Sequence, residues 1–145
     1  MSTKELQQTI AGNMKQWQKI EKASVVSTAH VLEKTDNPIV RLIMEIIQRD
    51  SQMHYRIQEL IVDSFEKKAI SLSTDELAAV WGLVEKHIEL EKQTVKFAEE
   101  ALAALKGKKM VVQEYLLNYL LTDEKKHNTV LSDMEKIKKG MYPYG

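Results

Sequence analysis

Apolar residues recur along most of the chain at alternating steps of three and four residues, the spacing of amphipathic helices. Four such segments stand out, and they predict helices at about 3–34, 38–66, 74–105 and 110–139. Helix start and stop signals separate the segments. These are the capping boxes Ser2-x-x-Glu5 and Ser73-x-x-Glu76, the pair Asn37-Pro38, and the glycines Gly107 and Gly140. No segment has the alternating pattern of a β-strand, so the predicted fold class is all-α. The tail 140–145 is expected to be mobile.

Each apolar stripe has the pattern of a four-helix-bundle seam, and each is interrupted near its middle by ionisable residues. The interruptions are Glu21 in the first segment, Asp50 and His54 in the second, His87 and Glu91 in the third, and Glu124 and His127 in the fourth. A carboxylate in an apolar seam costs several kcal/mol unless it is protonated, paired or bound to a metal. No Lys or Arg occupies these central positions.

Within each pair of consecutive helices, the ionisable interruptions also lie at the same height along the helix axes. Glu21 and Asp50 lie about equally far from the turn that joins their helices, and so do Glu91 and Glu124. Because a helix rises about 1.5 Å per residue, the polar side chains of each hairpin should face each other. Two divalent or trivalent cations would neutralise such a cluster, and its oxygen and imidazole ligands suit iron, manganese or zinc.

The amino-acid composition excludes several kinds of site and partner. At 145 residues, 43% hydrophobic and 29% charged, the chain is expected to form one globular domain, 1–145. Lys and Arg (21) balance Asp and Glu (21), which argues against a nucleic-acid surface. The absence of cysteine excludes disulfides, thiol catalysis, Cys-ligated clusters and a rubredoxin-type iron centre. No apolar run approaches a membrane span and no signal peptide is recognisable, so a cytoplasmic location is expected.

The pattern of carboxylates and histidines resembles that of the ferritin-like di-iron carboxylate proteins, and of rubrerythrin domains in particular. That family places a Glu on each of two helices and a Glu-x-x-His on each of the other two. Glu91 with Glu124-x-x-His127 matches one half of the pattern, and Glu21 with His54 matches the other. The resemblance spans residues 3 to 139. It departs from the family at Ser51, three residues before His54, where we expect Asp50 to substitute for the missing glutamate.

This resemblance implies a ferritin-like four-helix bundle that holds two iron ions, with manganese or zinc as alternatives. It implies the ligands Glu21, Asp50, His54, Glu91, Glu124 and His127, with His87 as an added ligand or a hydrogen-bond partner. The implied activity is ferroxidase- or peroxidase-like: oxidation of Fe(II), or reduction of peroxide or oxygen. Without cysteine-bound iron, turnover needs an external electron donor. A homodimer is also expected.

Several alternatives stay open. Residues 63–73 permit the long ferritin-like crossover only if the second helix ends early, so an up-down-up-down bundle is the alternative topology. Asp50 can instead accept a hydrogen bond from His54. The centre can hold a single zinc or manganese ion without a redox role. Alternatively, the protein is a non-catalytic structural or interaction module whose hydrogen-bonded polar layer fixes helix register.

Overall fold

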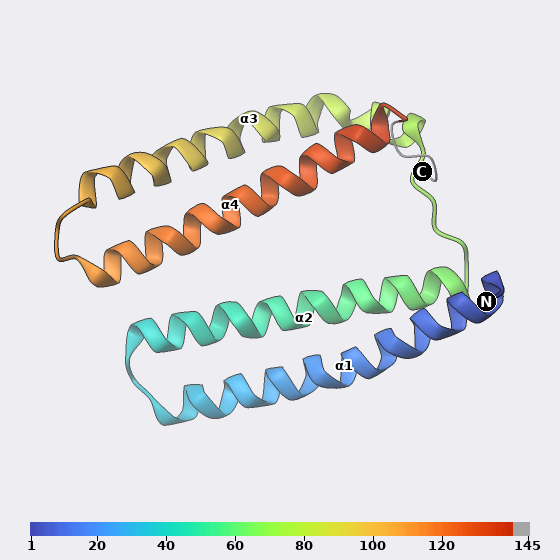
Figure 1. Cartoon of the computed structure of the whole chain (residues 1–145), viewed down its shortest axis with the longest axis horizontal. Helices are drawn as coiled ribbons and strands as arrows, with labels where there is room; N and C mark the ends of the chain where they lie inside the picture. Colours follow the sequence, from blue (N-terminus) through green and yellow to red (C-terminus); the bar gives the residue numbers. More distant parts are fainter. Residues whose placement is uncertain (141–145) are drawn as a thin grey trace. The chain divides into compact units, whose positions relative to one another are not determined.

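The computed structural model describes residues 1–140. They form four helices: α1 (Thr3–Lys34), α2 (Pro38–Glu66), α3 (Thr74–Leu105) and α4 (Val111–Lys138) (Figure 1). The predicted all-α fold class is confirmed, and each helix agrees with its predicted range to within one residue. Of the tail that was predicted to be mobile, residues 141–145 lie outside the described residues.

The predicted start signals form the expected hydrogen bonds. Ser2 and Glu5 make a reciprocal capping box at α1, with distances of 3.2 and 2.7 Å. Ser73 and Glu76 do the same at α3, with 3.1 and 3.0 Å. The Asn37 side chain accepts two backbone N–H groups at the start of α2. These bonds satisfy donors that a helix N-terminus otherwise leaves unpaired, so the sequence defines where each of these helices begins.

Glycines end α3 and α4. Gly107 and Gly140 adopt φ values of +77° and +68°, just beyond the last residues of these helices. This left-handed conformation closes a helix C-terminus and is strained for residues with a Cβ. The predicted capping role of Gly140 is therefore confirmed.

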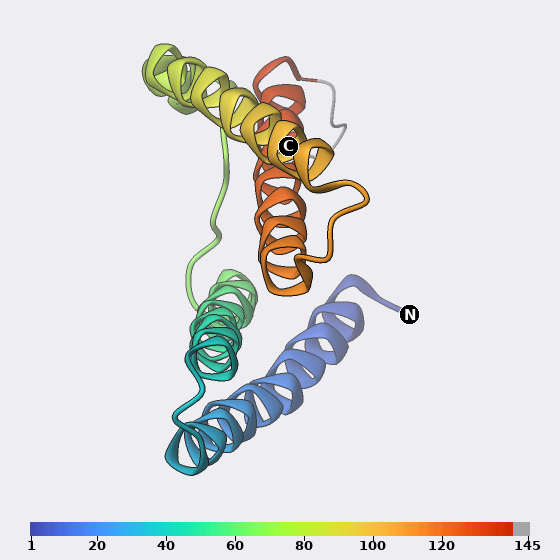
Figure 2. The same cartoon turned by 90° about the vertical axis from the view of Figure 1, so that its left-hand side faces the viewer.

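The helices pack as two hairpins. α1 packs on α2 within residues 1–70, and α3 packs on α4 in the second unit, which begins at Ser71 (Figure 1, Figure 2). Both hairpins are antiparallel, as the contacts Ser24–Ser51 and Thr94–Glu124 between their helices show. Each hairpin is a compact unit and is described by itself. The single domain 1–145 and its bundle topology therefore stay predictions.

The link between the hairpins bears on that topology. α2 extends to Glu66 and α3 begins at Thr74, so only residues 67–73 connect them. Seven extended residues span roughly 25 Å, whereas the 29-residue α2 is about 43 Å long. The link is too short to run beside the whole of α2.

The apolar stripes divide between two faces of each hairpin. Ala11, Thr28 and Val62 are buried between α1 and α2. Ile57, one residue before the buried Gln58, is 53% exposed, and Trp17 is 47% exposed. A bundle helix has two neighbours, and the stripes that face them are offset by about one residue, which a periodicity analysis does not separate. Each hairpin therefore has an inner seam and a second, exposed apolar face.

Membrane insertion finds no support in the part of the chain that the structure describes. None of the helices within residues 1–140 combines the length and the apolar character needed to cross a bilayer.

Removing the Ser73 hydroxyl tests whether the capping box of α3 stabilises the second hairpin. Ser73→Ala should lower the free energy of unfolding by about 1 kcal/mol, because it leaves the Glu76 N–H without its acceptor. Thermal unfolding followed by circular dichroism measures the loss. Ser71→Ala in the exposed link is the matched control and should have little effect. Equal loss in both variants would contradict a capping role.

Candidate metal centre

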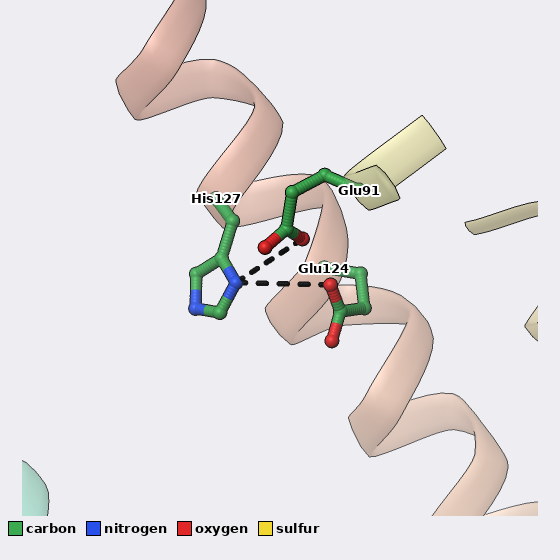
Figure 3. Close-up of side chains that lie close together, drawn as sticks. All are labelled: Glu91, Glu124 and His127. Atoms are coloured by element: carbon green, nitrogen blue, oxygen red, sulfur yellow. Dashed lines mark ion pairs between the residues drawn. The ribbon is translucent and has the colours of Figure 1, made fainter. Parts of the chain in front are cut away.

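Glu91, Glu124 and His127 converge at the middle of the second hairpin. Glu91 is buried on α3, whereas Glu124 and His127 are half-buried on α4. His127 Nδ1 lies 3.4 Å from Glu91 Oε2 and 3.7 Å from Glu124 Oε2 (Figure 3). One ligand atom from each residue lies within 4.8 Å of the other two. The three side chains form a group that can hold a metal ion.

The separations within this group suit coordination better than hydrogen bonding. Bonds from a tetrahedral ion to nitrogen and oxygen ligands are about 2.1 Å long, which places the ligand atoms roughly 3.4 Å apart. Glu91 Oε2 is buried and has no hydrogen-bond partner. A buried acceptor of this kind normally has a partner in a native protein. An imidazole nitrogen with two carboxylates is a ligand set for iron, manganese or zinc.

Three further side chains lie beside the candidate ligands. Thr94 Oγ1 donates to Glu124 Oε2 at 2.8 Å, and His87 Nε2 lies 2.9 Å from Glu91 Oε1. Asp123 Oδ2 lies 3.5 Å from His127 Nε2, the ring nitrogen that faces away from the two glutamates. At this distance Asp123 can form an ion pair with a protonated His127. Asp123 therefore belongs to the site, although the sequence analysis did not name it.

The two carboxylates of the group influence each other's ionisation. The pKa of Glu91 is lowered, chiefly because it is hydrogen-bonded to Glu124, with His87 and His127 acting in the same direction against burial. The pKa of Glu124 is raised, chiefly by the same interaction with Glu91. Like charges so close together do not both ionise readily without a cation. In the metal-free protein, Glu124 is the carboxyl that retains a proton to higher pH.

The first hairpin brings together fewer candidate ligands. His54 Nδ1 lies 3.5 Å from Glu21 Oε1, and Glu21 is 7% exposed. The Trp17 indole N–H donates to the same oxygen at 3.0 Å. The buried Ser51 shares a hydrogen bond of 2.8 Å with Ser24. This hairpin thus presents one carboxylate and one imidazole.

Several sequence predictions are confirmed at the level of geometry. Polar interruptions meet at one height in each hairpin, as Glu21 with His54 and as Glu91 with Glu124 and His127. Their roles as metal ligands stay predictions.

The remaining candidates occupy other places. His87 contacts Glu91, as one of its two predicted roles requires. Asp50 is half-buried on α2 and forms none of the hydrogen bonds or ion pairs described within residues 1–140. Trp17 donates a hydrogen bond to Glu21. The signal that could have revealed Asp123 is its spacing of four residues before His127, which repeats the spacing of Asp50 and His54.

In comparisons with protein-family models, curated proteins and solved structures, the chain matches none of them.

Replacing Glu124 by glutamine should stabilise the metal-free protein at pH 7. A raised carboxyl pKa stabilises the fold below the ordinary pKa, and this contribution is lost as the pH rises through the raised value. Glu124→Gln removes the repulsion from Glu91 and keeps an acceptor for Thr94. The expected gain in the free energy of unfolding is roughly 0.2–1 kcal/mol.

Chemical denaturation of the metal-free protein at pH 7 and pH 4 measures this gain. It should shrink at pH 4, where Glu124 of the unaltered protein is itself protonated. Glu85→Gln, on an exposed part of α3, is the control for removing one charge. A loss of stability in Glu124→Gln at pH 7 would show that the two carboxylates do not repel.

Proposed function

We propose that the protein is a ferritin-like metal-binding protein with a dinuclear carboxylate and histidine centre, occupied by iron. The observation that carries the proposal is the buried Glu91 Oε2, which lacks a hydrogen-bond partner and faces both His127 and Glu124. Membership of the ferritin-like family rests on the resemblance of the ligand pattern.

Each hairpin contributes to the proposed centre. Glu91, Glu124 and His127 hold one ion, with His87 beside Glu91. Glu21 and His54 contribute to the second position, and Asp50 is the further candidate there. Manganese and zinc fit the same ligands and are the alternative occupants.

Iron at such a centre supplies redox chemistry, since Fe(II) gives up electrons that oxygen or peroxide accepts. The residues of the chain bind and orient the ions and offset their charge. The pKa of Glu124 is raised, so protons compete with a cation for this carboxyl to a higher pH than for an ordinary glutamate. Because the chain has no cysteine, an external donor must return the electrons. A homodimer remains part of this proposal.

The alternative of a purely hydrogen-bonded polar layer explains the site less well. A layer that only fixes helix register is stable when each buried acceptor has a donor. Glu91 Oε2 has none, and the neighbouring His127 Nδ1 at 3.4 Å lies beyond the usual range of an N–H···O bond. A metal ion held by Glu91, Glu124 and His127 would give this oxygen a partner.

Metal content tests the proposal directly. The purified protein, reconstituted anaerobically with Fe(II), should retain iron, with up to two ions per chain by elemental analysis. Glu124→Ala should lower the retained metal sharply, because only Glu91 and His127 remain of the group. Retention should also fall between pH 7 and pH 5, as protons compete for the ligands.

Glu85→Ala on the exposed face of α3 is the matched control and should bind metal normally. Peroxide-dependent oxidation of added Fe(II) separates a redox centre from a structural zinc or manganese site. A folded protein that retains no iron, manganese or zinc would contradict the proposal and leave the register-fixing module as the explanation.

A further inference from the structure

The two hairpins repeat the same arrangement of side chains. Glu91 follows Glu21 by 70 residues, and His127 follows His54 by 73. The distance from the histidine Nδ1 to the buried glutamate is 3.5 Å in the first hairpin and 3.4 Å in the second. Each glutamate is also about equally buried, at 7% and 8% exposed. The same offsets therefore identify which residues of the two hairpins correspond.

At the position of Glu124, the first hairpin has Ser51. Ser51 precedes Glu124 by 73 residues, and each contacts the same position on the facing helix. Ser51 shares a 2.8 Å hydrogen bond with Ser24, and Glu124 accepts one of 2.8 Å from Thr94, 70 residues after Ser24. The contact is kept, but the carboxylate is replaced by a hydroxyl. The first hairpin consequently lacks one anionic ligand.

At the position of His87, the first hairpin has Trp17. Both residues lie four before the buried glutamate and contact its Oε1, at 3.0 Å for Trp17 and 2.9 Å for His87. Histidine can bind a metal or accept a proton, whereas the indole N–H only donates. Trp17 therefore satisfies Glu21 with a hydrogen bond and adds no ligand.

Asp50 corresponds to Asp123 and not to Glu124. Asp123 lies four residues before His127 and contacts its Nε2, and Asp50 lies four residues before His54. The correspondence is one of sequence position, because no ion pair or hydrogen bond joins Asp50 to His54 among the described residues. It does not give Asp50 the place of the missing carboxylate. Of the first hairpin's groups, Glu21 and His54 are then the two that can act as ligands.

Resting on the proposed function, we propose that the two metal positions are unequal. The ion at Glu91, Glu124 and His127 is bound tightly and permanently. The position at Glu21 and His54 binds its ion weakly, so that this ion exchanges with the solution and retains open coordination positions for water or a small ligand. Ser51 sets this difference.

The surroundings of Ser51 leave room for a larger side chain at this position. A mainly apolar open cavity of about 520 Å³ borders Ser51 and Glu21, with Val25 and Tyr55 also in its wall. Lys22 and Arg56 also lie in its wall, whereas His54 lines a different cavity. Ser51→Glu places a carboxylate at the position that corresponds to Glu124, three residues before the histidine.

Titration of the metal-free chain with Mn(II), followed by calorimetry, tests the proposal. The unaltered protein should bind one equivalent at least about 100-fold more tightly than the second, since the loss of even a supporting group costs 10–100-fold in affinity. His54→Ala should remove the weak equivalent and spare the tight one. Ser51→Glu should tighten the weak equivalent at least about tenfold. Co(II) absorption spectra of the same variants report the added ligand independently.

Gln52→Glu is the matched control, because it adds the same charge one residue away on an exposed position. It should leave both affinities nearly unchanged. Two equally tight equivalents in the unaltered protein would overturn the inequality, and so would loss of the tight equivalent in His54→Ala. If Ser51→Glu does not fold, His54→Ala alone decides the outcome. Absence of any bound Mn(II), Co(II) or iron is a failure of the proposed function itself.

Discussion

The burial of a glutamate at the middle of each hairpin is the constraint on which the rest of the structure depends. Glu21 and Glu91 are each more than nine-tenths buried between two helices. A carboxylate in that environment needs donors, a proton or a cation, because its lost hydration costs several kcal/mol. The neighbouring polar positions follow from this need: His54 and Trp17 surround one glutamate, and His87 and His127 surround the other.

Most of the fold could be predicted from the sequence because its signals are local. Ser2, Asn37 and Ser73 begin helices through bonds to residues two or three positions away. Left-handed glycines follow α3 and α4 for reasons that concern a single residue. The height at which Glu91 meets His127 follows from the rise per residue and the length of the turn. None of these features requires knowledge of distant contacts.

The parts that could not be predicted depend on which neighbour a residue faces. On α2, the stripe that includes Ile57 and the seam that includes Gln58 are offset by one residue, so periodicity alone merges them. Asp123 was missed because a carboxylate four residues before a histidine is also common on solvated helix faces. The repeat between the hairpins is difficult to read in the sequence. Serine replaces glutamate at Ser51 and tryptophan replaces histidine at Trp17, so only the contacts show that these positions correspond.

These replacements divide stability and metal binding between the two hairpins. In α1–α2, the hydrogen bond from Trp17 and the Ser24–Ser51 pair leave one carboxylate, Glu21, with donors of its own. The buried carboxylate of this hairpin thus has hydrogen-bond donors without a cation. In α3–α4, two carboxylates share one small volume, and Glu91 Oε2 has no hydrogen-bond partner. The second hairpin therefore retains the electrostatic strain that a cation relieves. The two hairpins therefore differ in how well their buried carboxylates are satisfied by hydrogen bonds within the chain.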